Sequence, residues 1–178
     1  MSSVSMVALE DLARLTCPYC GRSIAPDTPW VTAARERWGW VGVSAAVEGA
    51  PVGTILVAPN DDALGSTAAM VMCAWVRPGA TRLGVGRHLV QSLGAGLLPR
   101  QTRFIAARGS RAHISCAALP REFLRSTGFA RGSDDRLWRL NLDQTVVERP
   151  SLREVVERLV GVIRPVAPPE PAGRSGAS

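Results

Sequence analysis

The sequence predicts an α/β (α+β) fold, in which strands and helices share one hydrophobic core. Residues Ala68–Val76 form the longest apolar run in the chain, and its length is that of a buried strand. An amphipathic helix follows, because Val85, Leu89, Leu93 and Leu97 recur every four residues. With 178 residues, the chain is long enough for one domain with its own core and a short appendage.

Further elements are expected on both sides of this strand and helix. Strands are expected at residues 4–8, 42–47, 52–58, 104–107 and 137–142, and helices at residues 9–15, 33–38 and 120–126. A glycine-containing connector after Val47 is typical of a β-hairpin. Ser151-Leu-Arg-Glu154 is a capping box, which predicts an amphipathic C-terminal helix over residues 150–164. Residues 165–178 are rich in Pro, Gly and Ser, and we expect them to be disordered.

Composition limits the class of protein. No apolar run approaches the roughly 20 residues that a membrane-spanning helix needs. The first residues lack the basic start and apolar stretch of a secretory signal. We therefore expect a cytoplasmic protein without a membrane partner, whose four cysteines are reduced.

Positive charge is concentrated in the middle of the chain. The formal net charge is +6, and all 21 basic residues are arginine. Residues 1–76 carry 4 Arg and 7 acids, whereas residues 77–139 carry 12 Arg and 3 acids. Such a segment attracts polyanions, either nucleic acid or a phosphorylated cofactor. Aromatic residues make up only 5% and no nucleic-acid-binding motif occurs, so we expect no nucleic-acid partner.

The turn before the amphipathic helix has the features of an anion site. Gly84 and Gly86 let a ligand approach the backbone, and the first N–H groups of a helix have no internal partners. Arg82 and Arg87 flank the turn. A Walker loop is excluded because Arg-His follows Gly86, and a dinucleotide fingerprint needs a third glycine where Leu89 stands.

This turn resembles the Q/R-x-x-G-x-G/A pyrophosphate loop of the GNAT acyltransferases, with Thr81 at the position of the leading Gln or Arg. A second segment, Phe123-Leu-Arg-Ser-Thr-Gly-Phe129, resembles the F-Y-x-x-x-G-F motif of the same superfamily. The expected order of elements is also similar. The resemblance implies a GNAT domain over residues 1–145, with a mixed, mostly antiparallel central sheet and helices on both faces.

The resemblance also implies a function. It implies an acetyl-CoA-dependent N-acetyltransferase that passes the acetyl group directly to an amine of a small-molecule or peptide acceptor. A backbone N–H near residues 74–76 would hold the thioester oxygen. The residues expected to bind acetyl-CoA are Ala74, Trp75, Val76, Arg82, Leu83, Gly84, Val85, Gly86 and Arg87. The alternative is a non-catalytic GNAT-fold module that binds acyl-CoA or a protein partner.

The catalytic groups are harder to assign. The superfamily often uses the Tyr of F-Y-x-x-x-G-F as an acid, but Leu124 stands there, and Tyr19, the only tyrosine, lies elsewhere. Cys116 is one candidate acid, although a small buried residue of the core is the preferred interpretation, because a free cysteine is usually structural. Glu48 is the candidate base that we select. The residues considered beside it are Glu36, Asp61, His88 and His113, each of which also suits a surface or structural role.

Cys17-Pro-Tyr-Cys20 resembles one knuckle of a zinc ribbon. With the segment that begins at Cys116, it also resembles an actinobacterial-type GNAT subgroup with an N-terminal CxxC. A structural zinc needs four ligands, and no second CxxC pair exists. Simple packing is therefore preferred to a metal site, unless the fold brings Cys73 and Cys116 to the knuckle. The C-terminal helix could pack on its own domain or form a homodimer.

Overall fold

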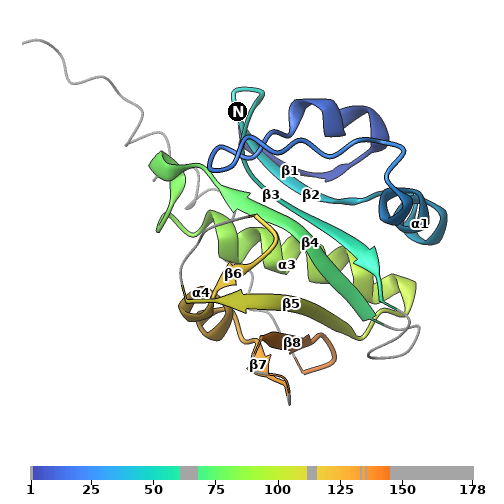
Figure 1. The fold of residues 1–178 in the computed structure, drawn as a ribbon, viewed down its shortest axis with the longest axis vertical. Coiled ribbons are helices and arrows are strands. Elements are labelled where there is room, and N and C mark those ends of the chain that lie inside the picture. Colours follow the sequence, from blue (N-terminus) through green and yellow to red (C-terminus); the bar gives the residue numbers. More distant parts are fainter. Residues whose placement is uncertain (1, 61–67, 112–115, 133, 135, 145–178) are drawn as a thin grey trace, which may run out of the picture.

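One mixed sheet forms the centre of the protein (Figure 1). The computed structural model describes residues 2–60, 68–111, 116–132, 134 and 136–144. The strands are β1 (Ser2–Val7), β2 (Gly42–Val47), β3 (Ala50–Pro59), β4 (Ala68–Val76), β5 (Phe104–Ser110), β6 (Leu119–Pro120), β7 (Ala130–Arg131) and β8 (Leu137–Asn141). Their order is β1-β2-β3-β4-β5-β8-β7, and β6 pairs with β5 off this path.

Most neighbouring strands run antiparallel, whereas β4–β5 and β5–β6 are parallel pairs. The helices are η1 (Leu9–Arg14), α1 (Pro29–Trp38), η2 (Pro78–Ala80), α3 (Val85–Leu97), η3 (Leu98–Arg100) and α4 (Arg121–Ser126), where η marks a 3-10 helix. In Figure 1, α3 lies behind the sheet and the segment from η1 to α1 lies in front of it. The predicted mixed, mostly antiparallel sheet with helices on both faces is confirmed.

The long helix α3 positions the functional site, and its sequence explains its packing. Val85, Leu89, Leu93 and Leu97 are all buried, as their spacing of four predicts for one face of a helix. This face packs against β2, β3 and β4. None of the described helices combines the length and apolarity that crossing a membrane requires.

Some predicted elements differ from the observed ones. The segment after β1 is a 3-10 helix, and α1 begins at Pro29 rather than at Ala33. Proline suits the first turn of a helix, because the N–H that it lacks would have no partner there. The strands β6 and β7 have two residues each, too few for a periodic signal. The predicted C-terminal helix and tail, residues 150–178, lie outside the described residues.

The edge of β4 opens toward the end of the strand. Its parallel pairing with β5 covers only Ala68, Ala69 and Met70. On its other side, β4 stays paired with β3 as far as Val76, with a register shift opposite the Leu56/Val57 step. The two parallel strands therefore separate, and the last residues of β4 present an edge that β5 does not cover.

Candidate active site

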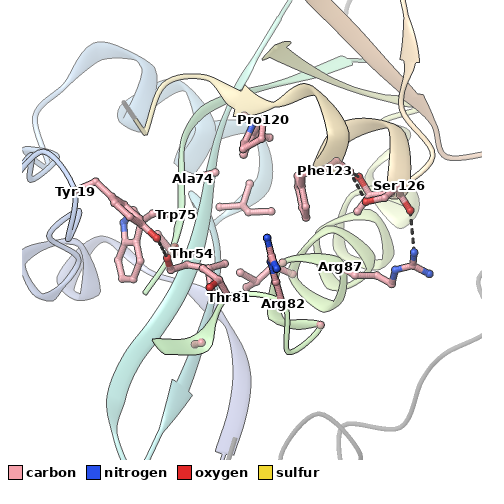
Figure 2. A pocket seen from close by; sticks show the side chains of 18 residues that line it. Tyr19, Thr54, Ala74, Trp75, Thr81, Arg82, Arg87, Pro120, Phe123 and Ser126 are labelled. Atoms are coloured by element: carbon pink, nitrogen blue, oxygen red, sulfur yellow. Dashed lines mark hydrogen bonds between the residues drawn. The ribbon is translucent and has the colours of Figure 1, made fainter. Parts of the chain in front are cut away.

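A cavity of about 530 Å³ lies where β4 and β5 separate (Figure 2). In Figure 2, Tyr19 and Trp75 lie to the left of the cavity, Pro120 above it, and Thr81 and Arg82 below it. The cavity is lined by Tyr19, Thr54, Ile55, Ala74, Trp75, Val76, Ala80, Thr81, Arg82, Gly84, Gly86, Arg87, Leu89, Leu119, Pro120, Phe123, Ser126 and Thr127. Its walls are mostly apolar, which suits a ligand that is held by shape and by a few polar groups.

The start of α3 forms one end of the cavity. Gly84 precedes the helix in a left-handed conformation, with φ of 86°. The first helical N–H···O bond in this turn runs from His88 to the Gly84 carbonyl, so the N–H groups of Val85, Gly86 and Arg87 precede the hydrogen-bond ladder of the helix. Such N–H groups and the helix dipole favour an anion at this end.

Two arginines add positive charge to this end of the cavity. Both Arg82 and Arg87 line it and are exposed. The Arg87 guanidinium donates a 2.9 Å hydrogen bond to the carbonyl of Ser126, which links α3 to α4 at one side of the cavity (Figure 2). Arg82 has a φ of 62°, a left-handed conformation that costs a non-glycine residue about 1 kcal/mol. The turn thus keeps a strained arginine beside the helix start.

Thr81 occupies the place where the family motif has Gln or Arg. Its hydroxyl donates a 2.8 Å hydrogen bond to the Pro78 carbonyl, so the side chain stabilises the turn from within. Arg82, next in the chain, is therefore the residue that brings charge to this part of the turn.

Gly86 is required by packing as well as by the cavity. A Cβ atom at this position would lie 2.7 Å from the Phe123 ring, closer than side-chain atoms approach one another. This contact brings the ring of α4 directly onto the first turn of α3. The second motif thus packs on the first one, although the two are far apart in sequence.

The uncovered edge of β4 is partly occupied by the protein itself. The Ala74 N–H donates a 2.7 Å hydrogen bond to the Cys116 carbonyl, on the side away from β3. Backbone N–H groups alternate between the two edges of a strand, so the Val76 N–H points to the same side as that of Ala74. The Cys116 carbonyl accepts from the Ala74 N–H and leaves the Val76 N–H to a ligand.

Tyr19 was not among the selected site residues, yet it lines the cavity. Its hydroxyl donates a 2.6 Å hydrogen bond to the Val76 carbonyl, on the open edge of β4. Burial, followed by the charge of Cys17, raises the pKa of the Tyr19 hydroxyl above its usual value. The one signal in the sequence was that Tyr19 is the only tyrosine of a chain that lacks one at Leu124.

The cavity brings together seven of the nine residues expected to bind acetyl-CoA: Ala74, Trp75, Val76, Arg82, Gly84, Gly86 and Arg87. The other two turn to the core, because Leu83 is half-buried against it and Val85 is only 2% exposed. Their side chains therefore do not line the cavity, and only their backbone could contact a ligand there.

The structure does not place the selected catalytic residues at the cavity. Glu48 is exposed in the turn between β2 and β3, and its φ is 51°. Cys116 is buried with its side chain among other cysteines, and neither residue lines the cavity. His88 and Glu36 also lie outside its lining. The remaining candidates, Asp61 and His113, are outside the described residues.

The fold does bring the cysteines together. The sulfur atoms of Cys17, Cys20 and Cys116 all lie within 4.8 Å of one another, and the thiols of Cys73 and Cys116 share a hydrogen bond. Burial raises the pKa of the Cys73 thiol, whereas the Arg22 backbone N–H and then the Cys17 thiol lower the pKa of Cys20 to about 7. Of the two cysteines that a metal site would need beside the CxxC pair, the fold brings Cys116 into the group, and Cys73 contacts Cys116 from β4.

The sequence matches the profile described as the acetyltransferase (GNAT) family over residues 8–95. This segment runs from the start of η1 into α3 and includes the glycine turn and the open end of β4. Together with the sheet topology, the match shows that the chain belongs to the GNAT superfamily of N-acetyltransferases. No curated protein sequence gives a significant match.

Solved structures of similar fold include several acetyltransferases. The putative acetyltransferase yncA from Salmonella typhimurium, solved with acetyl-CoA, has a TM-score of 0.58 at 15% identity, covering 84% of this chain and 99% of that one. Diaminobutyrate acetyltransferase EctA from Paenibacillus lautus was solved with its substrate and coenzyme A. It has a TM-score of 0.58 at 14% sequence identity, and the match covers 83% of this chain and 98% of that one. The PaiA N-acetyltransferase from Thermoplasma acidophilum, in complex with coenzyme A, has a TM-score of 0.57 at 12% sequence identity, and the match covers 79% of this chain and 99% of that one.

Proposed function

We propose that this protein is an acetyl-CoA-dependent N-acetyltransferase that transfers the acetyl group directly to the amine of a small molecule or peptide. The observation that supports this most is the cavity between the open edge of β4 and the start of α3. It offers an extended backbone edge at one end and positive charge with helical N–H groups at the other. A thioester on a long arm ending in phosphates needs both features.

The phosphates would bind at the glycine turn. The N–H groups of Gly86 and Arg87 and the guanidinium of Arg82 would share the negative charge. The arm of the cofactor would follow β4, where the Val76 N–H would donate to the thioester oxygen. This N–H would stabilise the negative charge that develops on the oxygen as the amine attacks.

Tyr19 would supply the proton that the departing thiolate needs. In the reaction the amine nitrogen forms a bond to the acetyl carbon, the carbon–sulfur bond breaks, and CoA leaves as a thiolate. The Tyr19 hydroxyl lies on the β4 edge and, with its raised pKa, stays protonated at neutral pH. It would donate its proton to sulfur and recover one from the new ammonium group through solvent.

The described lining of the cavity holds neither a carboxylate nor an imidazole. The proton of an alkylammonium acceptor would therefore have to leave before the amine binds, or pass to water. We expect the rate to rise with pH until the acceptor's own pKa is reached, rather than to follow an enzyme group near pH 6 to 7.

Two measurements test this proposal together. Acetyl-CoA should raise the unfolding temperature of the protein, because a ligand that binds only the folded state stabilises it. CoA release, followed with a thiol reagent, should then appear with at least one amine of a broad panel. Arg82→Ala should weaken both signals, whereas Arg77→Ala removes the same charge from a residue outside the cavity lining and should not. No thermal shift at millimolar acetyl-CoA would reject the proposal.

A second candidate is a non-catalytic module that binds acyl-CoA or a protein. Two observations favour it: the Cys116 carbonyl occupies the Ala74 N–H, and the buried Leu124 stands where the family motif has tyrosine. Binding of acetyl-CoA without CoA release for any amine would support this candidate. A homodimer and a cytoplasmic location stay predictions.

A further inference from the structure

Three cysteine sulfurs lie close enough together to share one metal ion. The Sγ atoms of Cys17, Cys20 and Cys116 lie within 4.8 Å of one another, and those of Cys20 and Cys116 are 3.7 Å apart. Sulfurs bound to tetrahedral zinc, at about 2.3 Å each, lie about 3.8 Å from one another. A disulfide would need its two sulfurs at about 2.05 Å. The observed spacing therefore matches an edge of a zinc–thiolate tetrahedron.

The CxxC segment is folded into a tight loop that presents both of its sulfurs. The Gly21 N–H bonds to the Cys17 carbonyl at 2.9 Å, and the Cys17 N–H bonds to the Arg22 carbonyl at 2.9 Å. Gly21 has a φ of 66°, which suits glycine. These bonds close the loop and fix the spacing of Cys17 and Cys20.

A fourth cysteine, Cys73, lies beside this group. Cys73 of β4 is buried, and its thiol is hydrogen-bonded to that of Cys116. It lies next to Ala74, whose N–H holds the Cys116 carbonyl. The backbone of β4 thus fixes the positions of Cys73 and Cys116 together. Three of the four cysteines, Cys17, Cys20 and Cys116, thus form one group, and Cys73 lies beside it against Cys116.

The buried Cys17 and the hydrogen bond from Tyr19 to Val76 hold the loop on the sheet, and a metal ion would add a third link. Pro18, Tyr19, Cys20, Gly21 and Arg22 are all exposed. A metal ion bound by the loop and by Cys116 would stabilise this exposed segment further, because metal binding is coupled to folding.

We propose that Cys17, Cys20, Cys73 and Cys116 bind one structural zinc ion, which fastens the CxxC loop to β4 beside the cavity. Four soft sulfur ligands in a tetrahedral arrangement favour zinc over harder divalent ions. Each thiol loses its proton to solvent on binding, and the four thiolates with Zn²⁺ leave a net charge of −2. Four protein ligands leave no open position, so the ion has a structural role.

The position of the cluster connects it to the cavity. Tyr19 lies between the two cysteines of the loop and reaches the Val76 carbonyl. An ion that fixes Cys17 and Cys20 therefore fixes the cavity wall that Tyr19 forms. This assignment does not depend on the proposed acetyl transfer, because the metal can be measured directly.

The test begins with the wild-type protein, expressed in zinc-containing medium without a histidine tag and dialysed before elemental analysis. We expect about one zinc per chain, released by a mercurial that reacts with thiols. Replacement by Co²⁺ should give intense visible bands of tetrahedral cobalt and a sulfur-to-cobalt charge-transfer band. Zinc far below one equivalent without such bands on cobalt addition, or a Cys20–Cys116 disulfide found by mass spectrometry, would overturn the proposal.

Variants then test the ligands. Cys17→Ser, Cys20→Ser and Cys116→Ser should each lose most of the zinc. Cys73→Ser should reduce the charge-transfer band in proportion to one thiolate in four. Tyr19→Phe changes the same loop but keeps every sulfur, so its zinc content should equal that of wild type. Unchanged zinc in any cysteine variant would remove that residue from the site, and unchanged zinc in all four would reject it. If a variant does not fold, the cobalt spectrum of wild type still decides.

Discussion

The hydroxyl of Tyr19 donates a 2.6 Å hydrogen bond to the main-chain carbonyl of Val76, across 57 positions of sequence. This contact joins the CxxC loop to the open edge of β4, where we propose that the thioester binds. It places the only tyrosine of the chain at the cavity, although the family motif puts its tyrosine at the position of Leu124. Leu124 is fully buried and does not line the cavity, so under the proposed function Tyr19 is the residue that supplies the acid.

Tyr19→Phe tests this relationship. If the hydroxyl protonates the thiolate, kcat should fall by on the order of 100-fold, the lower end for general acid catalysis. The wild-type rate should also fall at high pH, as tyrosine ionises above its ordinary value near 10, because the pKa is raised. The variant should lack this decline. Steady-state rates between neutral and alkaline pH measure both effects.

Acetyl-CoA affinity provides the control for this variant, because a phenyl ring keeps the shape of the cavity wall. An unchanged dissociation constant with a reduced kcat would separate catalysis from binding. Equal kcat values for both proteins, with the same pH profile, would show that the thiolate leaves without help from Tyr19.

Gly86→Ala tests the contact between the two motifs. The added methyl group would lie 2.7 Å from the Phe123 ring, so the ring or one of the two helices must shift. We expect a loss of about 1 to 3 kcal/mol in the free energy of unfolding, as for other overpacked sites. Chemical denaturation measures it, and acetyl-CoA binding should weaken in parallel.

Gly79→Ala is the matched control, because an added Cβ there meets nothing within 4 Å. It should leave stability and binding close to wild type. Phe123→Leu in the Gly86→Ala background should recover part of the lost stability by making room for the methyl group. If Gly86→Ala were as stable as wild type, the close packing of the two motifs would be wrong.

The sequence predicted the strand Ala68–Val76 and the amphipathic helix that includes Val85 and Leu97. Both are long segments in which the pattern of apolar residues follows which side chains are buried. The resemblance of two motifs to the GNAT superfamily implied the mixed, mostly antiparallel sheet that the structure has. The start of α1 was predicted four residues too late, because Pro29 suits the first turn of a helix but gives no apolar periodicity.

The site was less predictable, because its walls come from distant parts of the chain. The glycine turn is local, so most of the expected cofactor contacts do line the cavity. Tyr19 lies at the cavity because the fold places the CxxC loop beside β4. Cys20 contacts Cys116, which lies 96 residues further along the sequence. A single sequence holds no signal for such pairs. Cys116 was therefore considered as an acid, whereas the structure buries it among the other thiols.

Arg82 allows charge to be separated from backbone strain. Arg82→Gly removes both the charge and the left-handed strain, whereas Arg82→Ala removes the charge and keeps the strain. Both variants should bind acetyl-CoA about tenfold more weakly, as expected when one charge-assisted contact to a phosphate is lost. Only the glycine variant should gain stability, by about 1 kcal/mol.

Calorimetric titration and denaturation measure the two effects independently. The difference in affinity between wild type and either variant should shrink as salt is added, because screening weakens the contact of an exposed arginine with phosphate. Equal affinity of all three proteins at low salt would place the phosphates elsewhere.

His88 predicts a dependence of stability on pH. Both ring nitrogens are buried without a partner among the described residues, and burial lowers the pKa of the imidazole. The folded protein therefore binds a proton at His88 less readily than the unfolded chain, whose histidine titrates near pH 6.5. The stability that this difference contributes is fully present above this pH and is lost as the pH falls through 6.5 toward the lower pKa of the folded protein.

His88→Gln cannot take up this proton, so its free energy of unfolding should decrease less than that of wild type between pH 8 and pH 5. Urea denaturation at each pH measures the difference, with pH 8 as the reference at which both side chains are neutral. Parallel curves for the two proteins would show that His88 is as easily protonated in the folded protein as in the unfolded chain.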